Sequence, residues 1–283
     1  MTAKETPSFW EKLGKIDYRE IYAIMTILVA LPLIYPLGVP QSIGDNVKAY
    51  ANKLESLPDG SVVVCYFSGY ATMLSDCESI YYATWKILLN KDVKLLIVMA
   101  HPDSPIVIRQ EFEELGVGTT YDKVEGVDYV ILPYIDISSD AATMSFTENI
   151  RSVFTEDING VSLDELEMTK NITTAKDFTL VITLDPEFAN RRYTIPYGTP
   201  LVAWGTATGL LPFVAPFYNS ETGPIYGYVG GASQGAELES YTGYYGDGVK
   251  TNDAKNLGVI GLIAIVVIGN ISMIGTKYGG KKK

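Results

Sequence analysis

The chain has 283 residues, of which 47% are hydrophobic, so it is long enough for one sizeable domain together with membrane segments. Its 33 acidic and 22 basic side chains give a formal net charge of −11, and the acidic excess lies between residues 41 and 255. So acidic a region does not neutralise phosphates, which excludes nucleic acid as a partner.

Two uncharged apolar runs lie near the ends of the chain, at residues 21–39 and 257–275. Each approaches the roughly 20 residues that a helix needs to cross a hydrocarbon core of about 30 Å. Because basic residues flank both runs, the pattern favours two transmembrane helices over buried core helices. The polar tail 1–20 precedes the first run, and no small-residue cleavage pattern follows it, which argues against a removable signal peptide.

Basic side chains near the two runs predict the orientation of the chain. They gather in both tails, as Lys4, Lys12, Lys15, Arg19, Lys277, Lys281, Lys282 and Lys283. Because loops rich in lysine and arginine stay on the cytoplasmic side, both tails, 1–20 and 276–283, are predicted to be cytoplasmic. Residues 40–255 are then an extracytoplasmic domain.

Short apolar strands alternate with helices in this central region. Continuous apolar runs predict strands at 61–67, 93–100, 127–135, 178–184 and 200–206. Strands that are apolar throughout are buried on both faces, as in a parallel sheet covered by helices on either side. The alternation therefore predicts an α/β fold with a doubly wound, mostly parallel Rossmann-like sheet of about five strands. After residue 206 the pattern becomes irregular and rich in proline, glycine and tyrosine.

Cys65 and Cys77 are the only cysteines, one in a predicted strand and one in the helix that follows it. Two buried free thiols are the favoured interpretation. A disulfide is the alternative, because a helix packed on its own strand brings such residues together and an oxidising compartment would allow the bond. Neither cysteine has the close Cys/His spacing of a zinc site, so no metal site is predicted.

Polar side chains follow several of the predicted strands. Ligands of open α/β sheets bind beyond the carboxyl ends of the strands, which makes these side chains candidate ligand-binding residues. The candidates are Ser68, His101, Asp103, Asp136 and Asp185.

Two chemical alternatives use these candidates. A hydrolase would need Ser68 and His101 together, and a cation would need the three carboxylates. Each residue also suits an ordinary loop or helix cap, and Ser68 lacks the Gly-x-Ser-x-Gly pattern of a nucleophile elbow. No catalytic residue and no cofactor is therefore assigned.

The run YGYVGGASQGAELESY at 226–241 raises the question of a nucleotide-binding loop. It contains no Gly-x-Gly-x-x-Gly, and Ala236 and Glu237 stand where a Walker loop needs lysine and a hydroxyl. No nucleotide is therefore expected. Its glycines allow close backbone approach and its tyrosines suit protein interfaces, so it is predicted to contact neighbouring subunits together with the preceding GLLPFVAPFY. The interface candidates are Phe213, Phe217, Tyr226, Tyr228, Gly230, Gly231 and Tyr241.

Several stretches resemble a family of uncharacterised prokaryotic membrane-anchored α/β proteins. The resemblance is carried by LPDGSVV at 57–63, DFTLV at 177–181 and YGTPLVAWGTA at 197–207. It is also carried by GGASQGAELE at 230–239, where the family has GGxxGAAEYE and this chain has Leu238 in place of the aromatic residue. The resemblance implies one α/β domain between two terminal transmembrane helices, and it supplies no activity.

Together these features predict a two-pass protein of the cell membrane. Its exported domain is expected to be a non-enzymatic scaffold or binding subunit of a larger oligomeric envelope complex. The alternatives are an exported solute- or cation-binding domain and a hydrolase acting at the strand ends. The expected partners are membrane lipid and other subunits, identical or different.

Overall fold

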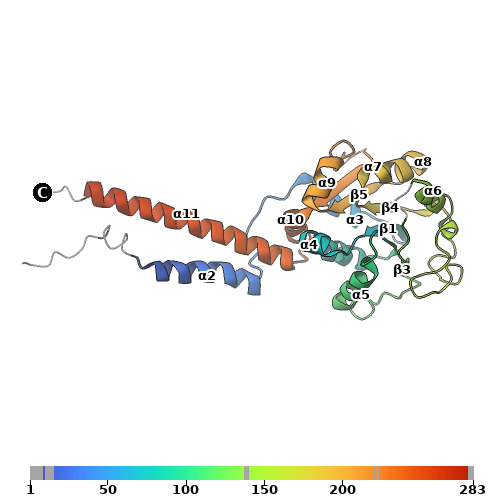
Figure 1. The fold of residues 1–283 in the computed structure, drawn as a ribbon, viewed down its shortest axis with the longest axis horizontal. Helices are drawn as coiled ribbons and strands as arrows, with labels where there is room; N and C mark the ends of the chain where they lie inside the picture. The colour runs from blue at the N-terminus through green and yellow to red at the C-terminus, as the bar shows by residue number, and fades with distance from the viewer. Residues whose placement is uncertain (1–8, 10–15, 137–139, 220, 222, 280–283) are drawn as a thin grey trace, which may run out of the picture. The chain divides into compact units, whose positions relative to one another are not determined.

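A computed structural model describes residue 9 and residues 16–136, 140–219, 221 and 223–279 of the chain (Figure 1). The chain divides into two compact units. The larger unit comprises Gln41–Gly248, and the smaller one combines Met1–Pro40 with Val249–Lys283.

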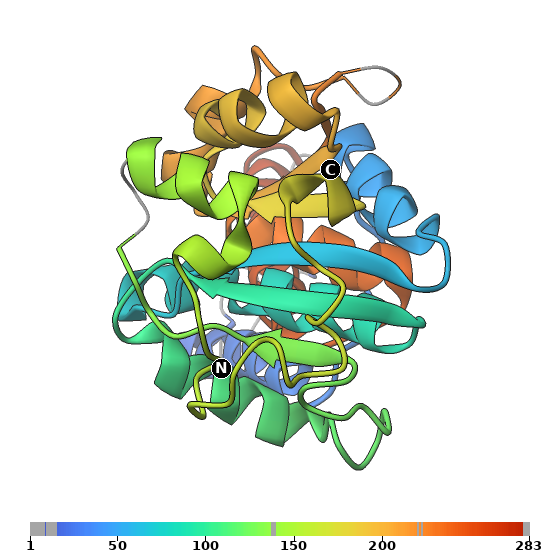
Figure 2. The same cartoon turned by 90° about the vertical axis from the view of Figure 1, so that its right-hand side faces the viewer.

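The larger unit is built on one six-stranded sheet in which every strand pair is parallel. The strand order is β3-β2-β1-β4-β5-β6, and Figure 2 shows the sheet from β3 through β2 and β1 to β4. The strands are β1 Ser61–Phe67, β2 Val93–Met99, β3 Tyr129–Ile131, β4 Leu180–Thr183, β5 Leu201–Gly205 and β6 Ile225–Gly230. The predicted α/β, Rossmann-like class is confirmed, and the expected number of about five strands is corrected to six.

Helices cover both faces of this sheet, because the side chains of each strand alternate between two separate cores. In β1, Cys65 and Phe67 point into one core with α3, α4, α5 and α10, while Val64 and Tyr66 point into the other with α6, α7 and α9. Both faces of the sheet are buried, which is why the strand sequences are continuous apolar runs. The helices and turns of this unit are α3 Asp45–Glu55, α4 Ala71–Leu89, α5 Ser104–Leu115, α6 Asp140–Glu148, η1 Ile150–Ser152, η2 Ala175–Asp177, α7 Pro186–Ala189, the π-turn η3 Asn190–Thr194, α8 Ile195–Tyr197, α9 Ala207–Val214 and α10 Gly231–Thr242.

The segment after residue 206 was expected to be irregular, and this expectation is wrong. It forms α9, β6 and α10 in succession. The Thr206 hydroxyl caps α9 by accepting a hydrogen bond from the Gly209 amide at 3.0 Å, and Leu210 and Val214 are buried beneath that helix. The sequence pattern did not predict this regular structure, because the segment is rich in proline and glycine, which normally mark turns.

The two cysteines are free and buried, as favoured from the sequence. Cys65 lies in β1 and Cys77 in α4, within the same core. Burial raises the pKa of the Cys77 thiol to about 12 and that of Cys65 further, so neither is a reactive thiolate.

The smaller unit contains the helices α2 Tyr18–Ile34 and α11 Asp247–Gly279. Among the described residues, α11 alone is long and apolar enough to cross a membrane. The expectation of two such helices is therefore supported for the second run only. The first run forms a helix of 17 residues that contains Pro32 and ends at Ile34, because Tyr35 is extended and Gly38 adopts a φ of 63°.

A close approach joins α2 and α11 within this unit. A Cβ atom added at Gly261 would lie 2.8 Å from the Met25 sulfur and 2.9 Å from Leu28 Cδ1. Nearby, the buried Asp253 carboxylate accepts hydrogen bonds from the backbone amides of Leu37, Gly38 and Val39 at 2.8 to 3.0 Å. These three bonds fix the chain that leaves α2 against the start of α11.

Candidate functional site: a cavity at the carboxyl edge of the sheet

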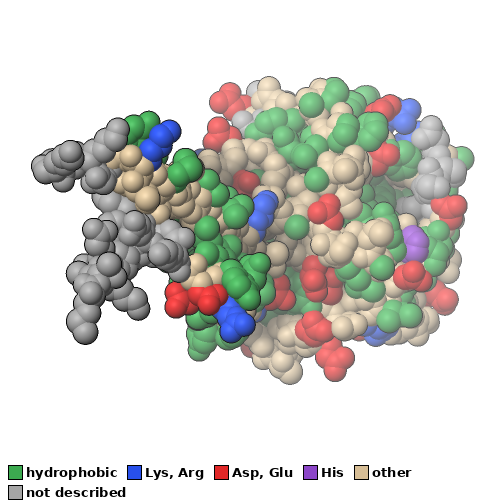
Figure 3. Space-filling model, turned by 60° about the vertical axis from the view of Figure 1, so that its left-hand side comes forward, with side chains coloured by type: hydrophobic (Ala, Val, Ile, Leu, Met, Phe, Trp, Pro, Cys, Tyr) green, Lys and Arg blue, Asp and Glu red, His purple; other side chains and the backbone are tan. Residues whose placement is uncertain are grey.

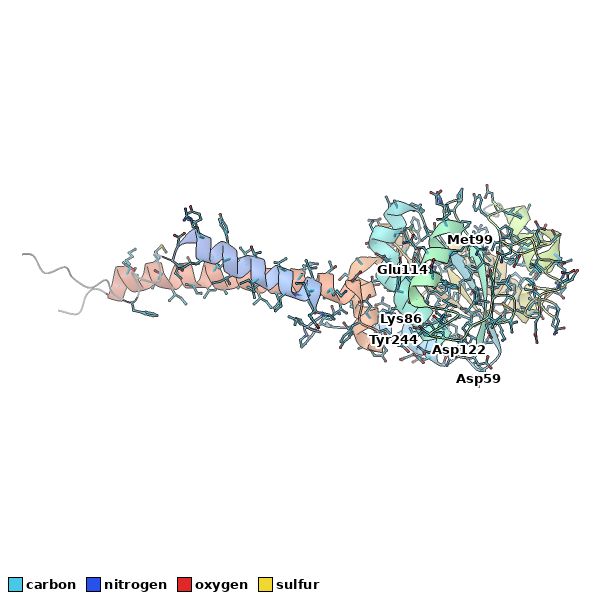
Figure 4. The ribbon with its side chains drawn as sticks, turned by 90° about the horizontal axis from the view of Figure 1, so that it is seen from below. Asp59, Lys86, Met99, Glu114, Asp122 and Tyr244 are labelled. Carbon is cyan, nitrogen blue, oxygen red and sulfur yellow. The ribbon has the colours of Figure 1, made fainter. Side chains whose placement is uncertain are left out.

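The carboxyl ends of the strands surround a cavity of about 180 Å³. Residues that end or follow β1, β2, β3 and β4 line it. Figure 4 labels Met99 at this edge and Asp59 at the opposite, amino edge. The strand order reverses between β1 and β4, and open α/β sheets hold their ligands at such a reversal, because the connections after the two strands leave toward opposite faces.

Apolar side chains form most of the lining, and three aromatic rings dominate it. Tyr66 belongs to β1, Tyr134 follows β3, and Phe188 belongs to α7. Tyr134 is 37% exposed and so stands at the mouth. The remaining apolar lining residues are Met99, Ala100, Ile135 and Leu184.

A hydrogen bond holds the Tyr66 side chain in place. Its hydroxyl forms a short hydrogen bond with the hydroxyl of Tyr193, which lies in the π-turn η3 and is fully buried. Burial raises the pKa of Tyr66, so both phenols stay neutral at ordinary pH. An extra residue in a helical turn re-aims side chains, and here the π-turn directs Tyr193 toward β1.

Besides the two tyrosines, two carboxylates and the Thr183 hydroxyl supply the polar part of the described lining. Asp185 follows β4 and caps α7, accepting the Phe188 amide at 3.0 Å through its Oδ1. The Thr183 hydroxyl accepts the Asp185 amide at 3.0 Å and donates to the Asp185 carbonyl at 2.9 Å. The hydrogen bonds of its backbone with Thr183 and of its side chain with Phe188 therefore fix the position of Asp185. Asp136, the second carboxylate, lies after β3.

The structure brings two of the five sequence candidates, Asp136 and Asp185, to the cavity, and it places the other three elsewhere. Ser68 is buried, and its carbonyl accepts the Tyr81 hydroxyl at 3.2 Å. The His101 ring packs on Tyr70 with ring centroids 4.9 Å apart. This histidine, purple in Figure 3, lies among acidic side chains.

The hydrolase alternative requires contact between Ser68 and His101. Both residues are described, and no hydrogen bond joins them. The Nδ1 atom of His101 instead accepts the Asp103 amide at 3.2 Å and lies 3.6 Å from that carboxylate. A nucleophile needs a base within hydrogen-bond reach, so this arrangement offers no activated serine.

The cation alternative requires converging carboxylates. Within the described part of the chain, no three His, Cys, Asp or Glu side chains are placed to hold a metal ion. Asp103 does not line the cavity that Asp136 and Asp185 share, so the proposed three-carboxylate set is not assembled.

Side chains of the chain itself bind three of the backbone amides that follow the strands at this edge. The Gly69 amide, just after β1, donates to the Ser104 hydroxyl at 2.9 Å, and a Cβ atom at Gly69 would lie 2.8 Å from Val107 Cβ. The Asp76 carboxylate accepts the amides of Ala207 and Ala232 at 3.0 and 3.1 Å, at the starts of α9 and α10. Helix N-termini attract anions, and an internal carboxylate already fills that role.

The predicted interface residues at 226–241 make contacts inside the chain. Gly230 and Gly231 are buried, and Gly231 adopts a φ of 77° with Ala207 directly against it. The Lys53 ammonium lies 4.2 Å from the centre of the Tyr226 ring. Tyr228 packs edge-on against Tyr218.

The remaining three interface candidates differ in exposure. Phe217 packs on the core of the larger unit. The Tyr241 hydroxyl donates to Asn52 at 3.0 Å, and its ring is 41% exposed. Phe213 is 57% exposed and is the most accessible of the seven.

Polar side chains of α10 hold neighbouring segments, a role not anticipated from the sequence. Gln234 accepts the Gly230 amide at 2.8 Å and the Asn46 side-chain amide at 3.2 Å. Glu237 accepts the Gly44 amide at 2.8 Å, and Glu239 accepts the Gly246 amide at 3.0 Å. The GGASQGAELE stretch is thus a junction between α3, β6, α10 and the chain that follows.

The chain matches no protein-family model, and no curated protein is similar enough to count as a relative. The case for a function therefore depends on the geometry of the cavity.

Proposed function

We propose that the chain is a membrane-anchored, non-enzymatic binding protein that holds a small molecule in the strand-end cavity. The observation that carries this proposal is the position of the cavity, at the reversal of strand order between β1 and β4. The lining supports binding rather than catalysis. Its described residues combine aromatic and aliphatic surface with few polar groups, as small-molecule sites do, and no cysteine, histidine or lysine is among them.

A two-pass topology belongs to the same proposal. The apolar side chains of α11 are largely exposed, which suits a helix surrounded by lipid. Those of α2 are also exposed, as at Ile24, Ile27 and Leu33, and 17 residues reach the lower end of known span lengths. We place both tails in the cytoplasm and the larger unit outside it, following the lysines and arginines of the tails.

Membership of a larger complex completes the proposal. The exposed Phe213 ring supports it, because large apolar side chains at the surface are favoured contact points between proteins. The contacts of the 226–241 segment inside the chain reduce the surface available for this purpose to Phe213, Tyr241 and their surroundings.

The binding role is tested by thermal unfolding of the full-length protein in lipid nanodiscs against a library of small amines, acids, sugars and nucleosides. Ala100 is exposed and lines the cavity, so Ala100→Trp fills the mouth without disturbing the core. Compounds that raise the unfolding temperature of the wild type should fail to do so in Ala100→Trp. The matched control is Glu165→Trp, at an exposed turn away from the cavity, which should respond as the wild type does. A library in which no compound depends on Ala100 in this way overturns the binding role.

The topology is tested with a glycan acceptor already present in the sequence. Asn171 begins Asn-Ile-Thr and is exposed in a turn of the larger unit. Translation into endoplasmic-reticulum microsomes should add one glycan, which Asn171→Gln removes. Asn270 in Asn-Ile-Ser lies within α11 and should stay unmodified. A chain that stays unglycosylated places the larger unit on the cytoplasmic side.

A further inference from the structure

The charged side chains among the described lining residues of the cavity are of one sign. Asp136 and Asp185 line it, and no lysine or arginine is among the ten residues that form the described lining. The Arg191 guanidinium, nearby in η3, lies 3.9 Å from the Glu187 carboxylate on the exposed side of α7. A ligand in the cavity therefore meets negative charge, which attracts a cation and disfavours a carboxylate or phosphate.

The aromatic rings favour the same sign of charge. Tyr66, Tyr134 and Phe188 present rings to the cavity, and the face of an aromatic ring attracts an ammonium or guanidinium group. Such contacts strengthen as water is excluded from the site. The same rings also supply apolar surface for the uncharged part of a ligand.

Three backbone amides at the carboxyl edge of the sheet already have partners in the chain. The Gly69 amide is bonded to Ser104, and the amides of Ala207 and Ala232 are bonded to Asp76. An anionic group would have to break these bonds to use these three donors. At the starts of α9 and α10 the carboxylate of Asp76 already occupies the place that an anion would take.

The volume limits the ligand to one ring or an equivalent body. Drug-sized ligands occupy pockets of about 300–1,000 Å³, whereas an apolar cavity of about 150 Å³ holds a benzene molecule. The present cavity, at about 180 Å³, is close to the second case.

From these observations we infer that the strand-end cavity binds a small organic cation. Its ammonium group lies beside the carboxylates of Asp136 and Asp185, and its apolar body lies among the rings of Tyr66, Tyr134 and Phe188. The inference rests on the proposed binding function and specifies the chemical class of the ligand.

Three probes of equal size separate charge from shape: phenethylammonium, 2-phenylethanol and phenylacetate. Their affinities are measured by calorimetry on the full-length protein in phosphatidylcholine nanodiscs at pH 7 and low salt, with empty nanodiscs as the blank for partitioning into lipid. Phenethylammonium should bind at least tenfold more tightly than 2-phenylethanol, and phenylacetate should bind most weakly. Ala100→Trp should abolish binding of all three.

Two neutral replacements test the carboxylates. Asp136→Asn and Asp185→Asn should each weaken phenethylammonium at least threefold and leave 2-phenylethanol unchanged. Asparagine keeps an oxygen that can cap α7, and if Asp185→Asn still lowers the unfolding temperature, Asp136→Asn decides the question. The matched control is Asp59→Asn, exposed at the opposite edge of the sheet, which should change none of the affinities (Figure 4).

The results separate the class of ligand from the binding function itself. Equal or tighter binding of the neutral or anionic probe, with the same dependence on Ala100, overturns the cation inference and leaves the binding function standing. Absence of measurable binding by all three probes also overturns the inference, while the library screen judges the binding function separately. An ammonium preference that survives both aspartate replacements shows that other groups set it, and the assignment to these carboxylates is then wrong.

Discussion

Replacing Gly227 with alanine should destabilise the larger unit strongly, because the backbone of α3 lies directly against β6 at this residue. A Cβ atom built at Gly227 would lie 2.7 Å from the carbonyl carbon of Ala49 and closer still to the backbone of Tyr50. Backbone atoms cannot rotate away as a flexible side chain can. The helix must therefore move by at least about 0.8 Å, and by more at Tyr50, to restore a normal carbon–carbon separation of about 3.5 Å.

That movement determines the size of the effect. Val47, Tyr50 and Leu54 of α3 are fully buried against the sheet. Burying each such side chain stabilises the fold by roughly 1.5–3 kcal/mol. A gap of about 0.5–1 Å forfeits a quarter to a half of the contact energy. The expected loss is therefore about 1–4 kcal/mol, or about 2–16 °C in the unfolding temperature of a unit of this size.

The measurement is thermal unfolding of the full-length protein, followed through the fluorescence of the buried Trp85 and Trp204. Gly118→Ala is the matched control, because a Cβ atom there meets only the Lys123 carbonyl at 3.7 Å, an ordinary contact. It should change stability by less than about 1 kcal/mol. If Gly227→Ala unfolds at the temperature of the wild type or above it, α3 does not pack on β6 as described.

Four further predictions concern other parts of the molecule. Burial raises the pKa of the Glu111 carboxyl to about 8, so the folded protein holds a proton that the unfolded chain releases above about pH 4.5. Stability should therefore fall as the pH rises from 4.5 to 8. Glu111→Gln should flatten that fall in a pH series of unfolding temperatures, and an unchanged slope would contradict the prediction. Asp253→Asn should speed hydrogen exchange at the amides of residues 37–39, because a carboxylate that accepts three amide hydrogen bonds is replaced by an amide with one oxygen. Unaltered exchange would show that these hydrogen bonds do not hold the segment. Phe213→Asp should give smaller particles in mild detergent than the wild type, and a wild type that is already monomeric would refute the oligomer. His101→Ala should leave the fold and Ala100-dependent ligand binding intact, since the ring lies outside the cavity lining; a selective loss of binding would bring His101 into the site.

The sheet could be predicted from the sequence as far as β5 because each of those strands is buried on both faces. A continuous apolar run that turn signals bound on both sides can also be a buried helix, but runs this short and rich in β-branched residues favour strands. β6 was not predicted, because its sequence gives only a weak strand signal. Its sequence is IYGYVG, and Gly227 is there because α3 leaves no room for a side chain, so the residue that permits the packing also weakens the strand signal.

Only those site residues could be predicted that follow a predicted strand directly in the sequence. Asp136 and Asp185 were found because the carboxyl edge of a parallel sheet follows from the strand assignment alone. Tyr66 was missed because the choice of face within β1 depends on the register of the whole strand. Phe188 was missed because α7 has four residues, too few for any periodicity to appear. Tyr193 depends on a π-turn, for which the sequence has no recognised signal.

The contact between α3 and β6 also determines when the larger unit can finish folding during synthesis. α3 is the first helix of the unit to leave the ribosome, and β6, the strand it covers, follows roughly 170 residues later, which corresponds to about 10–35 s at bacterial or eukaryotic elongation rates. Throughout this interval the apolar side of α3, with Val47, Tyr50 and Leu54, has no partner strand. Pairings between such distant segments close slowly, because the loop entropy is lost before the contact forms. The growing chain therefore exposes the apolar side of α3 from the start of the domain almost to its end, and this helix is where a chaperone in the compartment where the unit folds would be needed most.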